Sequence, residues 1–287
     1  MLLFVGWLIV SGALLGGFMF SGGNPGTLFV TGEYIIIIGI FLGYIVASSS
    51  GPVLKMMGKS IMTALKGSPY TQKRYIELVQ AIYQVLVLAR EKGVIGLEEH
   101  ILQPETSTIF ARYPSFLKDR HAVHFLQDTF RPLLDGKVKP EELSRSVEAQ
   151  LDNFFSMHSQ PTAVLTKASD ALPAIGIVAA VLGIVITMAS IAGDKAEIGE
   201  HVAHALVGTF LGLLLSYGFA QPLINRIETI HEEEISYLAV IGRMVISYAL
   251  GAPPMTAAEA GRLTIPVHHQ PSCDDMETLL KNAPSDS

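Results

Sequence analysis

The chain has 287 residues, of which 16% are charged and 49% hydrophobic, with 20 basic and 26 acidic side chains. Soluble globular domains carry about 25% charged residues, so this chain has too little charge for an ordinary water-facing surface. The net charge of −6 and the absence of a Lys/Arg-rich tract argue against nucleic-acid binding. The single cysteine, Cys273, allows neither an internal disulfide nor a Cys-based zinc site. The composition indicates an integral membrane protein.

Four apolar segments are long enough to cross the roughly 30 Å hydrocarbon core of a bilayer as helices. These segments, none of which contains Asp, Glu, Lys or Arg, are residues 2–20, 34–50, 171–193 and 201–225. Glu33, the only charged residue before Lys55, lies just outside the second segment. A cleaved signal peptide is the alternative for the first segment, but the segment lacks a basic start and a second apolar run follows at once. We predict an all-α membrane protein with transmembrane hairpins in residues 1–50 and 171–225.

The basic residues predict how these spans are oriented. Of the 20 Lys and Arg residues, 15 lie between Lys55 and Lys167 and four lie at or after Arg226, which leaves only Lys195 in a short loop between spans. Basic residues stay on the cytoplasmic side of a membrane. We therefore expect a cytoplasmic domain at residues 51–170 and both chain termini in the cytoplasm.

The cytoplasmic part is predicted to be helical. In its first long helix, apolar residues recur at three- and four-residue steps. The expected helices are residues 71–92, 97–102, 121–134, 140–155 and 226–254. Residues 255–287 contain Pro, Ser and Asp and are predicted to form a mobile C-terminal tail.

Motifs that would indicate catalysis are absent from the sequence. The chain has no Walker-type glycine loop, no Gly-x-Ser-x-Gly and no His-Glu-x-x-His, so we predict a protein that is not an enzyme and needs no cofactor. Residues 231–234 (His-Glu-Glu-Glu) are interpreted as a solvated helix face. His268 and His269 lie in the tail, and two adjacent residues cannot both face one site from a helix.

Small residues recur at four-residue spacing within the apolar segments, which lets helix backbones approach closely. The pairs are Gly12/Gly16, Gly39/Gly43, Gly176/Ala180, Ala179/Gly183 and Gly208/Gly212. This pattern indicates packed helices and no particular function. Because the predicted spans contain no Asp, Glu, Lys or Arg, we expect any titrating ion carrier to come from another chain.

Two segments carry a resemblance to a known family: Asp170–Gly183 (DALPAIGIVAAVLG) and His204–Pro222 (HALVGTFLGLLLSYGFAQP). They resemble the MotA family, the larger subunits of the bacterial flagellar stator, and the similarity covers nearly the whole chain except the tail. The resemblance implies an inner-membrane homopentamer around a dimer of a MotB-type partner, a single-span peptidoglycan-binding protein whose aspartate carries protons. It also implies that proton flow turns the pentamer against the rotor protein FliG.

Three other classes of function are compatible with a membrane helix bundle. The main alternative is a TolQ/ExbB-like proton-driven energiser of an envelope system, which is disfavoured because four spans are expected here instead of three. A membrane scaffold without ion flux and an intramembrane enzyme are the remaining classes. Membrane lipid is an expected partner in each case, and nucleic acid is not.

The resemblance assigns roles to four residues of the last two spans. Pro173 and Pro222 match prolines that couple ion flow to motion, although a helix's first turn or an ordinary kink would also accommodate them. Thr209 and Tyr217 are expected to line the ion pathway. A hydroxyl bonded back to its own helix and an interfacial anchor are the ordinary explanations of these two residues.

Ala180 bears on the identity of the ion, because sodium-driven relatives carry a threonine at this position. A methyl group offers no lone pair, whereas a dehydrated cation needs several oxygen ligands, so we predict that the coupling ion is H⁺. Arg90 and Glu98 match charges that contact the rotor, although both also lie where helix dipoles favour them. Further candidates for that contact are Arg74, Lys92 and Glu99.

Overall fold

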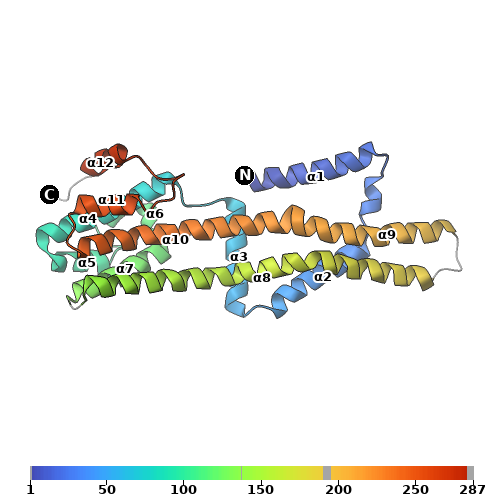
Figure 1. Cartoon of the computed structure of the whole chain (residues 1–287), viewed down its shortest axis with the longest axis horizontal. Helices are drawn as coiled ribbons and strands as arrows, with labels where there is room; N and C mark the ends of the chain where they lie inside the picture. The colour runs from blue at the N-terminus through green and yellow to red at the C-terminus, as the bar shows by residue number, and fades with distance from the viewer. Residues whose placement is uncertain (1, 137, 190–194, 283–287) are drawn as a thin grey trace. The chain divides into compact units, whose positions relative to one another are not determined.

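The structure is a computed structural model that describes residues 2–136, 138–189 and 195–282, and every regular element in these ranges is a helix (Figure 1). The expected all-α fold is thereby confirmed. The longer helices are α1 (Leu2–Phe20), α2 (Thr31–Ala47), α3 (Gly51–Lys66), α4 (Gln72–Lys92), α7 (Arg120–Leu134), α8 (Pro140–Ala189), α9 (Lys195–Leu213) and α10 (Gln221–Ala249). The shorter ones are η1 (Pro25–Leu28), η2 (Val94–Leu97), α5 (Glu98–Leu102), η3 (Phe110–Arg112), α6 (Pro114–Leu117), the π-helix η4 (Leu214–Ala220), α11 (Pro254–Arg262) and α12 (Cys273–Lys281).

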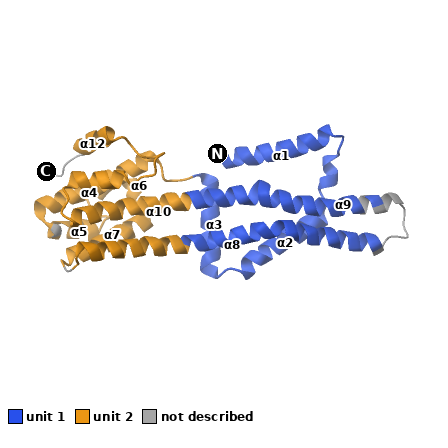
Figure 2. Cartoon of the chain, viewed as in Figure 1, with its two compact units in different colours: residues 1–67, 158–229 blue, residues 68–157, 230–287 orange. Residues whose placement is uncertain are grey.

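The chain divides into two units, each formed from two separate stretches of sequence (Figure 2). Unit 1 comprises Met1–Gly67 and His158–Thr229, and unit 2 comprises Ser68–Met157 and Ile230–Ser287. Helices α8 and α10 each contribute residues to both units.

Four helical stretches are long and apolar enough to cross a membrane, as predicted. They are Leu2–Phe20, Pro25–Ala47, Pro140–Met188 and Val202–Ala249. Two of them differ from the prediction at their ends. Helix α2 begins at Thr31 and so includes Glu33, and α8 is one helix of 50 residues that joins the expected helix 140–155 to the third span. Residues 190–193 of the predicted third span lie outside the described residues.

Unit 1 has a small apolar core and a large apolar surface. Its core cluster is Ile37, Leu172, Ile175, Ala179 and Leu211. Helix α1 buries no residue, and Leu2 and Leu8 are 88% and 73% exposed. Apolar helix faces of this extent are stable in contact with lipid or with other membrane helices and unfavourable in water.

Unit 2 is built around aromatic side chains. Its largest fully buried residues are Tyr75, Phe110, Phe116, Phe130 and Tyr237. The predicted helix 71–92 is confirmed as α4, and it begins where the Thr71 side chain accepts a hydrogen bond from the backbone N–H of Arg74. The predicted helix 121–134 is likewise confirmed as α7.

We correct the prediction of a mobile C-terminal tail, because residues 255–282 are ordered in the structure. They contain α11 and α12. The Arg262 side chain is buried, donates two hydrogen bonds of 2.7 Å to the Glu259 carboxylate and a third of 2.9 Å to the Pro271 carbonyl. Ser272 then caps α12. The polar residues that suggested disorder therefore serve as caps and as an anchor for the turn.

Candidate functional site

The closest approach between α8 and α9 in unit 1 is between backbone atoms. A Cβ atom added to Gly176 would lie 2.7 Å from the Gly208 carbonyl oxygen, and one added to Gly212 would lie 2.5 Å from the Leu172 carbonyl oxygen. Real Cβ atoms do not approach so closely, so only glycine fits at these positions. The predicted small-residue packing is confirmed for this pair of helices.

The glycine pairs Gly12/Gly16 of α1 and Gly39/Gly43 of α2, which we call glycine stripes, are not packed closely against another described helix. A Cβ atom added to Gly12, Gly16, Gly39 or Gly43 would meet no described atom within 4 Å. These stripes are therefore open on the surface of the described chain, and the four-residue spacing alone does not distinguish them from the packed pair.

Pro173 lies inside α8, and the structure shows how its missing N–H is compensated. A proline cannot donate to the carbonyl four residues earlier, which here belongs to Ser169. The Ser216 hydroxyl in η4 donates to this carbonyl oxygen at 2.8 Å, and both serine side chains are fully buried. The link ties the interrupted turn of α8 to the neighbouring helix. No feature of the sequence pattern pointed to either serine.

Pro222 lies at the second position of α10, directly after the π-helix η4. In η4 the backbone N–H of Gln221 donates to the Ser216 carbonyl, five residues earlier. In α-helical register the N–H of residue 222 would be required by the Gly218 carbonyl, and proline cannot supply it. The wider π-turn lies directly before this proline, and such turns are frequent at functional sites.

Glu33 corrects the prediction that the membrane helices carry no ionisable residue. It lies in the first turn of α2, is only 5% exposed, and projects between Gly183 of α8 and Gly208 of α9. Among the described residues, no hydrogen-bond partner reaches its Oε2 atom. The sequence analysis placed this residue outside the span because it started the helix at residue 34, three positions after Thr31, where α2 begins.

The three predicted ion-pathway residues are in different environments. Ala180 is 8% exposed and faces Gly208 across the α8/α9 contact. Thr209 is half-buried beside Gly176, and Tyr217 is 60% exposed. The structure brings Ala180 and Thr209 to the same helix contact and leaves Tyr217 on the surface of η4.

The two predicted rotor-contact residues are exposed in unit 2. Arg90 lies in the last turn of α4, where it lines an open pocket of about 430 Å³ together with Tyr248 and Pro253. Glu98 is exposed at the first position of α5. Both residues are therefore accessible on the described chain.

Arg74 is not a surface charge of this kind. Its Nη2 atom lies 2.5 Å from Asp119 Oδ2, with both side chains largely buried, and its guanidinium carbon lies 4.9 Å from the ring centroid of Tyr70 and 5.2 Å from that of Tyr237. We therefore correct its interpretation as a rotor-contact candidate to a structural role in unit 2.

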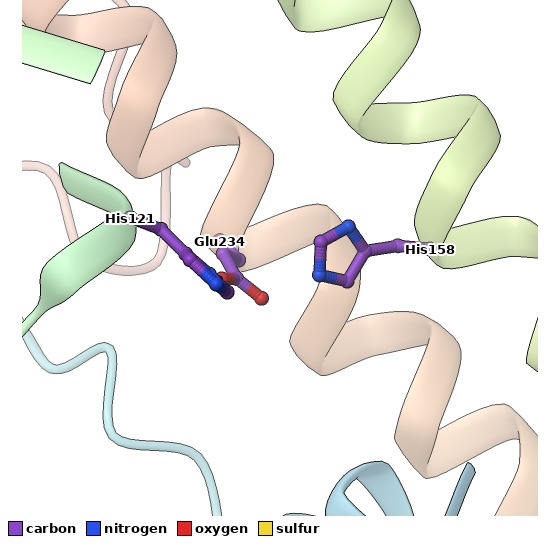
Figure 3. Close-up of side chains that lie close together, drawn as sticks. All are labelled: His121, His158 and Glu234. Atoms are coloured by element: carbon purple, nitrogen blue, oxygen red, sulfur yellow. The ribbon is translucent and has the colours of Figure 1, made fainter. Parts of the chain in front are cut away.

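We also correct the interpretation of residues 231–234 as a solvated helix face, because two of these residues face other parts of unit 2. Glu233 is 7% exposed rather than solvated. Glu234 Oε1 lies 2.7 Å from His121 Nδ1 of α7 (Figure 3). The periodic apolar residues correctly predicted this helix. The prediction that its acidic residues lie on a solvated face was wrong for Glu233 and Glu234.

These features define a multi-pass membrane helix bundle whose central pair packs backbone to backbone beside a buried carboxylate. Residues 4–93 match the family model for the motility protein A N-terminal region, and residues 118–239 match that of the MotA/TolQ/ExbB proton channel family. The chain is 34% identical to motility protein A of Salmonella typhimurium over 98% of this chain and 95% of the relative. It therefore belongs to the motility protein A family.

Further relatives agree with this assignment. The chain is 33% identical to chemotaxis protein LafT of Vibrio parahaemolyticus over 96% of this chain and 97% of the relative. A solved structure of C. jejuni MotAB matches 92% of this chain and 95% of its own with a TM-score of 0.75 at 18% identity. The flagellar MotAB stator complex from Bacillus subtilis matches with a TM-score of 0.73 at 20% identity, over 96% and 98% of the two chains. At these identities the likeness of the structures concerns the fold.

Proposed function

We propose that this chain is a flagellar stator subunit that conducts protons together with a MotB-type partner and converts their flow into rotation of the rotor. The observation that carries the proposal is the α8/α9 contact, in which glycine backbones touch, together with the Ser216–Ser169 hydrogen bond at Pro173 and the π-turn before Pro222. Membership of the motility protein A family supports it. The TolQ/ExbB-like alternative is disfavoured, since residues 4–93 match the motility protein A N-terminal model.

In this proposal the chain forms a homopentamer in the bacterial inner membrane, with both termini in the cytoplasm. The partner supplies a titrating aspartate beside α8 and α9, and Arg90 and Glu98 contact FliG. One charge that crosses 100 mV releases about 2.3 kcal/mol, which is enough to bias two helix arrangements that differ by a few kcal/mol. Such a rearrangement would either keep the Ser216–Ser169 hydrogen bond and the π-turn of η4 intact or replace them with other contacts.

We further propose that Glu33 contributes a carboxylate of this chain to the proton pathway. Ionisable residues are expensive within a bilayer and commonly mark ion routes. Glu33 is buried against Gly183 and Gly208, at the helix contact that also contains Ala180. A carboxyl at this place can accept and release a proton without the oxygen cage that a metal cation requires.

The proposed coupling ion is H⁺, with no cofactor. Ala180, whose backbone nitrogen lies next to Gly208, supports this choice because its methyl group adds no oxygen ligand at the α8/α9 contact. The chain would act as a channel and mechanical element rather than as an enzyme.

The experiment is rotation of tethered cells that lack their own stators and express this chain with its partner. With sodium held constant, rotation should stop when a protonophore collapses the proton gradient. Rotation that continues on sodium would contradict the ion assignment. Absence of rotation with both proteins in the membrane would contradict the stator proposal itself.

The contribution of Glu33 is tested separately by Glu33→Gln, which preserves shape and removes the titrating group. We expect a loss of proton-dependent rotation and conductance of about tenfold or more, in the range that general acid–base groups contribute. The matched control is Glu228→Gln, because Glu228 is an exposed carboxylate of the same unit. Equal rotation in both variants would remove Glu33 from the pathway and leave the stator proposal intact.

A further inference from the structure

Three potential metal ligands converge in unit 2, away from the α8/α9 contact. Glu233 projects from α10, and His268 and His269 lie in the segment between α11 and α12. The Nε2 atom of His268 is 3.7 Å from Glu233 Oε1, and that of His269 is 3.8 Å from the same oxygen. One ligand atom from each of the three residues lies within 4.8 Å of the others. Two adjacent residues cannot both face one site from a helix, but these histidines lie in a turn, and both approach Glu233.

These distances suit a tetrahedral transition-metal site. Zn²⁺ binds histidine nitrogen at about 2.0–2.1 Å and carboxylate oxygen at about 2.0–2.2 Å, so neighbouring ligand atoms around a tetrahedral ion are roughly 3.3 Å apart. The two nitrogen–oxygen separations of 3.7 and 3.8 Å need to shorten by only a few tenths of an ångström. The ring centroids of His268 and His269 are 4.2 Å apart, and one ligand nitrogen of each lies within 4.8 Å of the other.

The carboxylate is held in place by a second layer of contacts. The Ser68 hydroxyl donates a hydrogen bond to Glu233 Oε2, which leaves Oε1 directed at the histidines. The Tyr75 hydroxyl donates to the Glu233 backbone carbonyl at 2.9 Å, and the Tyr75 ring lies 5.8 Å from the ring of His269. Outer contacts of this type orient the ligands of metal sites.

The accessibility of the ligands also favours metal binding. The side chain of Glu233 is 9% exposed, whereas that of His268 is 61% exposed. An ion therefore has an open approach on the His268 side, where water can complete the coordination.

We propose that Glu233, His268 and His269 form a Zn²⁺ site that joins the C-terminal segment to α10. Two imidazoles and one carboxylate favour Zn²⁺ over Mg²⁺ or Ca²⁺, which prefer all-oxygen sites. The bound ion would restrain residues 263–272, the connection between α11 and α12. The site does not depend on the proposed stator function, and its test requires no motility measurement.

The test uses the full chain purified with its partner, stripped of metal with a chelator and titrated with Zn²⁺ alone. The variant His268→Gln/His269→Gln should lose one bound Zn²⁺ per chain, and the single variants should each bind at least tenfold more weakly. The matched control is His124→Gln, because His124 is an exposed histidine of the same unit. Equal Zn²⁺ stoichiometry and affinity in the wild type and the double variant would overturn the proposal.

A second variant addresses the case in which histidine substitution disturbs the turn. Ser68→Ala keeps all three ligands and removes only the support of Glu233, so Zn²⁺ affinity should fall roughly 10-fold. Bound Co²⁺ should give the intense visible absorption of a tetrahedral ion in the wild type and the His124 variant, and lose it in the double variant. Slower hydrogen exchange of residues 263–272 with Zn²⁺ should follow the same pattern. A Co²⁺ spectrum of octahedral type in the wild type would contradict the site.

Discussion

Unit 1 and unit 2 hold their helices together in opposite ways. In unit 1 the closest contact is between glycine backbones, Gly176 against Gly208 and Gly212, and side chains contribute little to it. In unit 2 the helices are kept apart and joined by large aromatic residues and by the buried Arg74–Asp119 pair. The reason is the surrounding medium: lipid tails do not drive apolar side chains together, so membrane helices associate through close packing, whereas water does drive them together.

This difference predicts which substitutions each unit tolerates. Unit 2 should be sensitive to loss of a side chain or a charge partner, because removal leaves a cavity or an uncompensated charge. The α8/α9 contact of unit 1 should be sensitive to addition of atoms, because there is no space for a Cβ atom at Gly176 or Gly212. The predictions below test this contrast, starting with the largest effect.

Arg74→Met should destabilise unit 2 by about 3–5 kcal/mol, because it leaves Asp119 as a buried charge without its partner. Thermal unfolding of the purified complex and hydrogen exchange of α4 and α7 measure the effect. The control is Lys73→Met, whose partner Glu77 lies 3.9 Å away and whose own side chain is 87% exposed, so the expected change is at most about 1 kcal/mol. Similar losses in the two variants would contradict a structural role for Arg74.

Gly176→Ala should separate α8 from α9 and cost about 2–3 kcal/mol, because the new methyl group would meet the Gly208 carbonyl oxygen, a backbone atom that cannot rotate away. We expect rotation of tethered cells to be abolished while the protein still reaches the membrane. Gly39→Ala is the control from an open stripe. If Gly39→Ala is equally damaging, that stripe packs against another chain, and if Gly176→Ala rotates normally, the close contact is not required.

Ser216→Ala should cost about 1–2 kcal/mol, because the Ser169 carbonyl freed by Pro173 loses a donor in a buried position. Reduced torque at unchanged membrane levels is the expected readout. Ser236→Ala is the control, since that hydroxyl only bonds back to the Glu232 carbonyl of its own helix. A double-mutant cycle with Pro173→Ala tests the explanation, because the cost of Ser216→Ala should shrink once residue 173 has an N–H.

Charge reversal at Arg90 or Glu98 should have the smallest effect on the chain itself, within about 1 kcal/mol of wild-type stability, because both side chains are exposed. Swimming should nevertheless fall several-fold if these charges contact the rotor. Glu105→Lys, at another exposed acidic residue of unit 2, is the control. Unchanged swimming in Arg90→Glu and Glu98→Lys would contradict the proposed rotor contact.

The elements most visible in the sequence are those with a strong local pattern. The four apolar stretches and the amphipathic helix α4 were predictable because hydrophobicity and periodicity are properties of a continuous segment. The order of the C-terminal segment was not predictable, since it depends on what Arg262 and the two histidines meet after the turn.

The candidate site shows the same limit. Pro173 and Pro222 could be selected from sequence because the family resemblance assigns them roles, although the residues alone also allowed ordinary explanations. Ser216 could not, because its role depends on a carbonyl 47 residues earlier in the chain. Glu33 was assigned to a loop rather than to the membrane helix because the predicted start of the helix, residue 34, lies three residues after its start in the structure.

The π-helix η4 changes the direction in which every later side chain of this helix points. A π-turn holds one residue more than an α-turn, and each residue of an α-helix advances the side-chain direction by about 100°. A helical wheel drawn in one piece through Val202–Ala249 would therefore assign every side chain after Ala220 to a direction more than a quarter turn away from its true one. Conversion of Leu214–Ala220 to α-helical winding without a deletion would rotate the side chains of α10 by about 100°, whereas deletion of a single residue there would restore regular winding and leave their directions unchanged.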